Sequence, residues 1–199
     1  LRTSVSYRGG VVTDYEYDPD TFRLTRLTTR RGGGGGPLQD LRYTYDPVGN
    51  VTQIRDGAQR EVFFANQVAS PNNSYTYDPT YRLIHAEGRE HVGQANAAAG
   101  YTHDDWRRTR LAHPGDGGAM ARYGESYEYD PVGNLQAMAH TSGIAGVAWR
   151  RTFAYEEPTQ LDDTVGGAPR RSNRLTSSTI AGITATFSVG GDGYDPHGN

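Results

Sequence analysis

Polar and apolar residues alternate in short runs along this chain, and each run ends in a turn signal. Tyr43 and Tyr45 are two residues apart, so on a strand they share one face, where aromatic side chains are favoured. Asp46 opens a four-residue Asp-Pro-Val-Gly stretch that matches a type I turn, and Gly49 suits the left-handed residue that completes a hairpin loop. The pattern predicts a β-hairpin.

The return strand of this hairpin departs from simple alternation. Val51 and Ile54 are apolar and three residues apart, whereas a strand with one buried face shows a period of two. Either both faces of the return strand are partly covered, or a β-bulge shifts its register.

The hairpin recurs, which indicates an array of small units that bury surface only against one another. An almost identical copy begins at Tyr127, and looser copies begin at Tyr15 and Tyr75. A truncated copy begins at Tyr194. The recurring residues are predicted to be structural: Tyr15, Tyr17, Asp18, Tyr43, Tyr45, Asp46, Gly49, Asn50, Tyr75, Tyr77, Asp78, Tyr127, Tyr129, Asp130, Gly133, Asn134, Tyr194, Asp195, Gly198 and Asn199.

Several copies vary. Tyr81 stands where other copies have glycine, and because a bulky residue disfavours positive φ, a different turn is predicted there. The stretch Asp18–Leu24 is one residue longer. Phe153–Glu156 reads as a decayed copy whose return strand, Asn173–Thr176, follows a long insertion, and Tyr101–Asp104 is a weaker candidate.

The motif Y-x-Y-D-x-x-G-N-[LV] resembles the YD repeat, also called the Rhs repeat. With Arg60–Phe64 and Gly88–His91 between copies, the stretch Tyr43–Gln94 is similar to the C component of insecticidal toxin complexes and to related Rhs toxins. In that family the repeats wind a spiralling β-sheet into a hollow shell around a toxic C-terminal domain. The resemblance implies an all-β fold, an array of YD-repeat hairpins forming part of such a sheet.

The chain is interpreted as one partial repeat array over residues 1–199, truncated at both ends, because it begins at Leu1 and stops inside a turn motif. Gly32–Gly36 is predicted to be a flexible loop between repeats. A short helix is predicted over Glu90–Ala99. Further strands are predicted within Arg2–Tyr17, Glu61–Phe64, Val147–Phe153 and Leu175–Val189.

The motif aspartates invite an acid–base interpretation, but catalysis needs two carboxyl groups in unlike environments against one substrate. One carboxylate at the same turn position in every copy is what side-chain capping of a turn produces. Turn capping is therefore the preferred interpretation for Asp18, Asp46, Asp78, Asp130 and Asp195.

The other candidate chemistry is weaker. His103 and His113, with Asp104 and Asp105, form the densest acid–imidazole group, but no metal-ligand spacing is present, so the six histidines are predicted to lie on the surface or in loops. Trp106 and Trp149 each precede two arginines; such pairs can stack on sugars or bases, but they are more typical of strand aromatics with solvated neighbours.

Composition adds little about partners. The 14 tyrosines and 26 glycines favour many short strands and turns, and a net charge of −3 gives no sign of a nucleic-acid partner. No cysteine is present, so thiolate metal sites are excluded, and no cofactor, metal or membrane span is predicted.

The resemblance implies a non-enzymatic shell segment of a secreted bacterial toxin that encloses and carries a toxin domain. Its partners would be the rest of its own shell, the enclosed domain and other toxin-complex subunits. The alternative is an extracellular surface that binds glycans or proteins. A buried or lumenal tyrosine face favours the shell, and a solvent-facing aromatic row favours binding.

Overall fold

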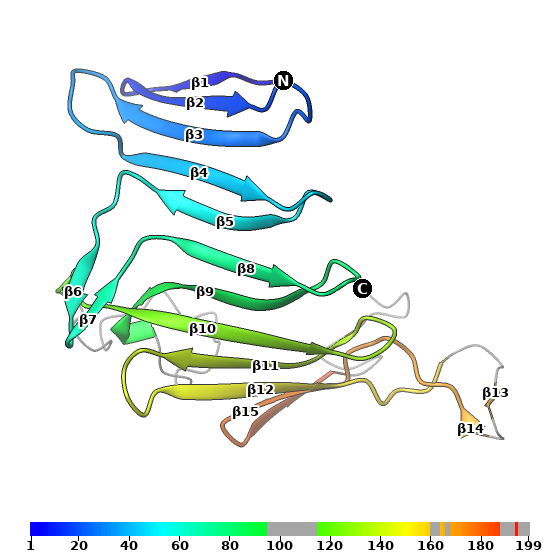
Figure 1. Ribbon diagram of the computed structural model, residues 1–199. Helices are drawn as coiled ribbons and strands as arrows, with labels where there is room; N and C mark the ends of the chain where they lie inside the picture. The colour runs from blue at the N-terminus through cyan, green and yellow to red at the C-terminus, as the bar shows by residue number, and fades with distance from the viewer. Residues whose placement is uncertain (95–114, 160–163, 166–167, 188–193, 195–199) are drawn as a thin grey trace.

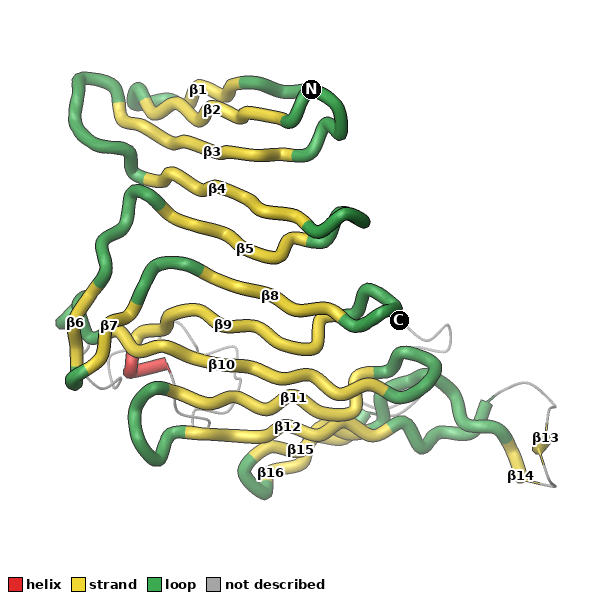
Figure 2. Tube along the Cα trace, in the orientation of Figure 1, coloured by secondary structure: helices red, strands yellow, loops and turns green. Residues whose placement is uncertain are grey.

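The computed structural model describes residues 1–94, 115–159, 164–165, 168–187 and 194 (Figure 1). Twelve strands form one antiparallel sheet in the order β1-β2-β3-β4-β5-β8-β9-β10-β11-β12-β15-β16. Strands that are neighbours in the sheet also follow one another in the chain, apart from the small β6–β7 and β13–β14 hairpins. Figure 2 shows that strands and loops make up the described chain apart from one short helical turn after β9. The predicted all-β array of hairpins is confirmed.

The bounds of the strands follow the repeat. The first half of the chain holds β1 Ser4–Tyr7, β2 Val11–Tyr17, β3 Leu24–Arg31, β4 Gln39–Tyr45, β5 Val51–Asp56, β6 Val62–Phe64, β7 Gln67–Ala69, β8 Asn73–Tyr77 and β9 Leu83–His91. The second half holds β10 Met120–Tyr129, β11 Leu135–Ser142, β12 Ala148–Ala154, β13 Thr164–Val165, β14 Ala168–Pro169, β15 Ser177–Ile180 and β16 Ile183–Thr186.

Each motif hairpin contains a β-bulge just after its turn. In the β4–β5 hairpin Tyr45 pairs with Val51 and Thr44 pairs with Gln53, so Thr52 is left over. The extra residue explains why the apolar positions of the return strand are three apart, and the bulge alternative is confirmed. The equivalent extra residues in the other copies are Thr25, Ile84 and Gln136.

The two faces of the sheet differ in chemistry. Residues directly opposite on neighbouring strands share a face, and one such row runs Tyr75, Ala86, Glu125, His140 and Trp149 across five strands. The adjacent rows on this face carry Tyr15, Leu27, Leu41, Tyr43, Ile54, Tyr127, Met138 and Ile180. We call it the aromatic face.

The opposite face carries ion pairs, some partly buried and some exposed, and is called the charged face. Arg26 pairs with Asp40 at 2.7 Å, and Arg150 pairs with Glu128 at 2.8 Å. Because the sheet is a single layer, the buried apolar residues of the described chain are small: Ala69, Ala86, Ala119, Ala121 and Ala137. Ala86, Ala121 and Ala137 lie within the large sheet, whereas Ala69 lies on the β6–β7 hairpin, which packs near β10; no large side chain of the described residues is fully buried.

The helix predicted over Glu90–Ala99 is wrong where the structure describes it. Glu90 and His91 continue β9, because each pairs with a residue of β10, Ala121 and Met120. Cross-strand pairing outweighs the weak helix preference of a short segment. Only Val92–Gln94 forms a 3₁₀ turn within the described part of this segment, and the remainder lies outside the described residues.

Other predicted strands are confirmed. β1 and β2 meet at Gly9 and Gly10, and β15 and β16 meet at Ala181 and Gly182. The segment predicted as one strand at Glu61–Phe64 is half of a separate hairpin, β6–β7, which packs near β10. Its turn is made by Ala65 and Asn66, which both have positive φ. Because neither residue is glycine, the sequence gives no clear signal for this turn.

The glycine-rich segment connects β3 to β4. Gly33, Gly34 and Gly35 all have positive φ, between 93° and 115°, which explains why this loop is built from glycine. Its flexibility stays a prediction. In the described residues no helix is long and apolar enough to cross a membrane.

Candidate functional site: the repeated turns and their neighbours

The aspartate of each described motif binds the backbone of its own turn. Asp46 Oδ1 accepts hydrogen bonds from the backbone N–H groups of Gly49 at 2.7 Å and Asn50 at 2.8 Å. Its Oδ2 accepts from Asn50 Nδ2 at 2.8 Å. Asp130 makes the equivalent two contacts with Asn134, and its Oδ1 also accepts from the backbone N–H of Val132 at 3.0 Å. Both carboxylates are therefore already occupied as hydrogen-bond acceptors inside their turns.

These contacts favour the ionised carboxylate. Burial opposes ionisation of Asp46, but hydrogen bonds from the Asn50 side chain and backbone and from Gly49 outweigh it, so the pKa of Asp46 is lowered. The same balance lowers the pKa of Asp130 and that of Asp78. In Asp18 the largest cause of the lowered pKa is the hydrogen bond from the backbone of Thr21.

The predicted exception at Tyr81 is wrong. Tyr81 has φ of 66°, and the turn closes as its relatives do, with Tyr81 N donating to Asp78 O at 2.9 Å and Asp78 N donating to Arg82 O at 2.9 Å. Gly49 and Gly133 occupy the same position at φ of 113° and 100°. The Tyr81 side chain is 60% exposed, so it meets no packing obstacle, and four hydrogen bonds to the Asp78 carboxylate offset the backbone strain.

The longer first turn reaches the same conformation. Phe22 has φ of 58° and is 66% exposed, and its backbone N–H donates to Asp18 O at 2.9 Å. One added residue before the left-handed position is accommodated inside the loop, because the closing bond from Asp18 N now reaches Arg23 O.

The second tyrosine of each motif joins its repeat to the preceding one. The Tyr45 hydroxyl donates to Leu24 O at 2.7 Å, and the Tyr77 hydroxyl donates to Val51 O at 2.9 Å. The remaining members of this tyrosine ladder are Tyr17 on Arg2 O, Tyr129 on Leu83 O, Tyr155 on Leu135 O and Tyr194 on Leu175 O. Tyr155 thus behaves as the second tyrosine of the decayed fifth copy, with Leu175 at its return position.

An arginine reinforces two of these joints. The Arg23 guanidinium lies over the Tyr45 ring, 5.7 Å from its centroid, and donates to the carbonyls of Asp46 at 3.1 Å and Pro47 at 3.3 Å. Arg82 lies 5.0 Å from the centroid of the next repeat's tyrosine, Tyr129, and donates to Asp130 O at 3.0 Å. We call these two arrangements arginine clamps. A sequence signal accompanies the clamps: in the first four copies, the residue before the return apolar position is Arg23, Asn50, Arg82 and Asn134 in turn.

The first tyrosines of the motifs lie on the aromatic face and are half-buried there. Burial raises the pKa of Tyr43 and of Tyr75, and burial together with a hydrogen bond to Glu125 raises that of Tyr127. Tyr15 is the equivalent residue on β2. A row of half-buried phenol groups suits a surface that faces a confined space or another chain.

A buried histidine cluster on the aromatic face was missed by the sequence analysis. His140 is 5% exposed, which corrects its assignment to the surface, and its two ring nitrogens lie 3.2 Å from Glu125 and 3.2 Å from Glu90. Its ring stacks between Tyr123 and Trp149, with centroids 5.7 Å and 5.0 Å away. Burial raises the pKa of Glu90. These partners come from four strands, β9 to β12, so the cluster ties four strands together.

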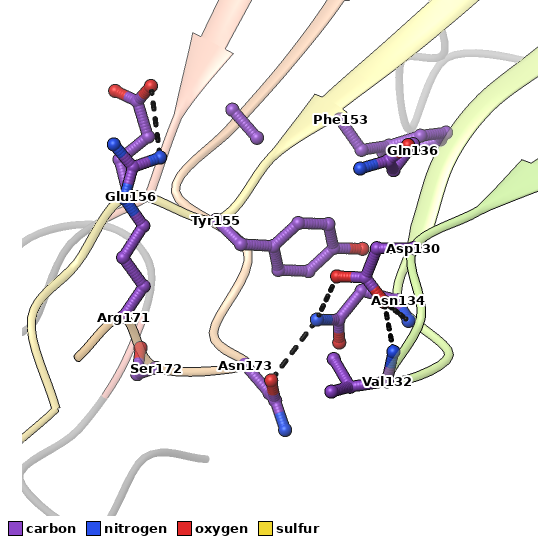
Figure 3. Close-up of a pocket in the computed structure, with 11 residues that line it drawn as sticks. Asp130, Val132, Asn134, Gln136, Phe153, Tyr155, Glu156, Arg171, Ser172 and Asn173 are labelled. Carbon is purple, nitrogen blue, oxygen red and sulfur yellow. Dashed lines mark hydrogen bonds and ion pairs between the residues drawn. The ribbon is translucent and has the colours of Figure 1, made fainter. Parts of the chain in front are cut away.

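A cavity of about 390 Å³ lies beside the fourth motif turn. Tyr155 lies in its middle in Figure 3, with Asp130 and Asn134 on one side and the Glu156–Arg171 pair on the other. Asn134 Nδ2 donates to Asn173 Oδ1 at 3.1 Å across one edge. The fifth copy has no short Asp-Pro turn, so the space between repeats is bounded here by the long insertion.

Some predicted residues lie outside the described chain. These are Asp195, Gly198 and Asn199, the candidate copy at Tyr101–Asp104, and His103, His113, His197 and Trp106. No group of three or more acidic, histidine or cysteine side chains that would hold a metal ion occurs in the described ranges.

Comparison with known proteins identifies two relatives in one bacterium. Toxin subunit YenC2 of Yersinia entomophaga is 40% identical over 190 residues, which are 92% of this chain and 18% of that protein. Toxin subunit YenC1 of the same organism is 39% identical over 140 residues, 68% of this chain and 14% of that protein. The chain thus spans less than a fifth of either curated relative. No protein-family model matches it.

Solved structures of toxin complexes share the fold. The TcdB2–TccC3 crystal structure superposes with a TM-score of 0.61 and 35% identity over 85% of this chain and 7% of that chain. A Tc holotoxin pore structure from Photorhabdus luminescens gives a TM-score of 0.59 and 36% identity over 76% of this chain and 7% of that chain.

Proposed function

Because the chain is a YD-repeat protein that resembles the repeat region of the C component of insecticidal toxin complexes, we propose that it is a wall segment of a shell enclosing a toxin domain. The shell carries the toxin domain, which is encoded C-terminal to the repeats, and it is secreted and works with other subunits of a toxin complex. The segment itself is non-catalytic.

The observation that carries this proposal is a single-layer sheet with two unlike faces. A shell wall needs a water-facing side and a side that tolerates enclosed polypeptide. Exposed ion pairs such as Arg150–Glu128 suit the outer side. The half-buried aromatic face, with Tyr43, Tyr75 and Trp149, suits the lumen. The aromatic face therefore faces inward in this proposal.

The turn edge supports a structural role. Arginine clamps and the tyrosine ladder join each repeat to the next, as a continuous wall requires. The four motif carboxylates that the structure describes, those of Asp18, Asp46, Asp78 and Asp130, accept hydrogen bonds within their own turns, so none of these four is poised toward a substrate. We expect the chain to hydrolyse no ester, glycoside, peptide or phosphodiester; turnover lost in Asp46→Asn or Asp130→Asn would contradict this.

Labelling of engineered cysteines tests the enclosure. Since the chain contains no cysteine, Ile54→Cys on the aromatic face and Arg55→Cys on the charged face form a matched adjacent pair on β5. Both are made in the full-length protein that contains this chain, treated with a large maleimide reagent, and quantified by mass spectrometry of the tryptic peptide. We expect labelling of Arg55→Cys in the native protein and of Ile54→Cys only after denaturation.

Equal native labelling of both positions would refute the lumenal placement. It would favour the alternative, a solvent-facing aromatic surface for glycans or proteins.

A further inference from the structure

At two joints of the tyrosine ladder, the residue before the accepting leucine covers the ring of the donating tyrosine. Tyr45 donates to Leu24 O, and the residue before Leu24 is Arg23, which covers the Tyr45 ring. Tyr129 donates to Leu83 O, and Arg82, just before Leu83, covers the Tyr129 ring in the same way. The geometry is therefore a repeated guanidinium site.

At Tyr155 the same site is built without its arginine. Tyr155 donates to Leu135 O at 3.0 Å, and the residue before Leu135 is Asn134. The Asn134 amide is short and stays on its own turn, on Asp130 Oδ2 at 2.8 Å. The cavity of about 390 Å³ lies at this position and is lined by the Tyr155 ring (Figure 3).

The walls of the cavity suit a cation. Glu156 takes the chain position of Asp46 and Asp130, whose carbonyl oxygens accept from Arg23 and Arg82 at the clamped joints. The Glu156 carboxylate is itself at the cavity, where Arg171 lies 3.9 Å from it with both side chains 69% exposed. So loose and exposed a pair leaves the carboxylate able to accept another partner.

We propose that this cavity binds the guanidinium group of an arginine side chain presented by a partner protein. The arginine stacks on Tyr155, as Arg23 stacks on Tyr45, and donates toward Glu156. This goes beyond a wall segment, because it gives the turn edge of the sheet a point of attachment for another subunit. The occupant is inferred from the chain's own repeats, which fill two equivalent positions with arginine.

The site should prefer arginine to lysine. A guanidinium is planar, so it lies flat over a tyrosine ring while its N–H groups point outward in its own plane, toward acceptors around the edge of the ring. An ammonium group is compact and strongly hydrated, and it does not match both features at once.

The probes are Nα-acetyl-arginine methylamide and its lysine counterpart, titrated into the isotopically labelled chain. Binding is read from the NMR signals of the side-chain amides that line the cavity, Asn134, Gln136 and Asn173. We expect saturable shifts, with the arginine probe binding about two- to fivefold more tightly, as a cation–π contact predicts. Equal affinity, or shifts that do not saturate, would overturn the proposal.

Variants separate the site from general charge attraction. Tyr155→Leu should abolish the preference for arginine, whereas Tyr155→Phe keeps the ring and should retain it even though the ladder bond is lost. Asn134→Arg should fill the cavity from within, as Arg82 does at its joint, and should block the probe. Glu128→Gln, on the charged face, is the matched control and should bind like the wild type.

Arg171→Gln identifies the occupant. It should raise the affinity of the arginine probe slightly, because a neighbouring positive charge is removed. Binding seen only in Arg171→Gln would mean that Arg171 itself occupies the site, and the partner proposal would fall. Unchanged binding in Asn134→Arg or a retained preference for arginine in Tyr155→Leu would place the probe elsewhere.

Discussion

Gly49 and Gly133 hold the same position in two nearly identical turns, but their surroundings differ. Both have positive φ, so alanine at either position costs about 1–2 kcal/mol of backbone strain. A Cβ atom at Gly49 would also lie 2.9 Å from Nη2 and 3.2 Å from Cζ of Arg23, whereas at Gly133 it would meet no heavy atom within 4 Å in the described part of the chain.

Alanine at Gly49 must therefore displace the arginine clamp. Arg23 would lose its bonds to the carbonyls of Asp46 and Pro47 and its place over Tyr45. Two partly exposed charge-assisted hydrogen bonds are together worth about 1 kcal/mol after solvent screening. We expect Gly49→Ala to lower the free energy of unfolding by about 2–3 kcal/mol and Gly133→Ala by about 1–2 kcal/mol.

Urea denaturation followed by tyrosine fluorescence measures both values, and a double-mutant cycle isolates the clamp. In an Arg23→Ala background there is no guanidinium to displace, so Gly49→Ala should cost the same as Gly133→Ala. Equal costs in the wild-type background would show that the clamp contributes nothing. An excess that survives in the Arg23→Ala background would show that the strain lies elsewhere.

Three further predictions concern the turns and the histidine cluster. Tyr81→Gly should raise the urea midpoint, because it relieves about 1 kcal/mol of left-handed strain from an exposed residue; a lower midpoint would mean that the Tyr81 ring contributes packing. Asp46 and Asp130 have lowered pKa values in the folded state, so their stabilisation is present above the unfolded pKa near 4 and is lost as pH falls through the folded pKa values. Asp130→Asn should therefore reduce the amount by which the free energy of unfolding falls between pH 5 and pH 2. An unchanged dependence of stability on pH would contradict this assignment. His140→Leu should lower the free energy of unfolding in urea by about 3 kcal/mol, because it leaves Glu90 and Glu125 facing each other without their shared partner. Adding Glu90→Gln to this variant should recover part of the lost stability. No recovery would mean that ring stacking, not charge, dominates the cluster.

Local features of the fold were predictable because they depend on residues that are close together in the sequence. The turn at Asp46–Gly49 follows from side-chain capping and glycine at positive φ, and the bulge follows from the spacing of Val51 and Ile54. The turn at Tyr81 was predicted wrongly because the prediction considered only the steric cost of positive φ. Four hydrogen bonds to the Asp78 carboxylate, which form only once the turn closes, offset that cost.

The histidine cluster has no local signature. Glu90 lies 50 residues before His140, and the two meet only because β9, β10 and β11 align in one register. Trp149 faces His140 through the β11–β12 register in the same way. A one-residue slip in any of these pairings would put the partners on opposite faces, so a sequence without its register cannot reveal the cluster.

The clamps divide the array into unequal joints. Arg23 binds the first motif turn to the second, and Arg82 binds the third to the fourth. Between the second and third turns stands Asn50, whose amide remains on Asp46 of its own turn. At that joint β5 and β8 pair at two positions, Gln53 with Ser74 and Ile54 with Asn73, whereas β9 and β10 pair at seven.

The weaker turn contact and the shorter ladder therefore coincide. Because the cost of separating two strands grows with the hydrogen bonds and side-chain contacts between them, the β5–β8 joint should open at lower free energy than the clamped joints on either side. The tyrosine ladder still crosses it, through Tyr77 on Val51 O. We therefore expect the cooperative unit of this sheet to be a pair of hairpins joined by an arginine, with the boundary between units at the joint where Asn50 replaces the arginine.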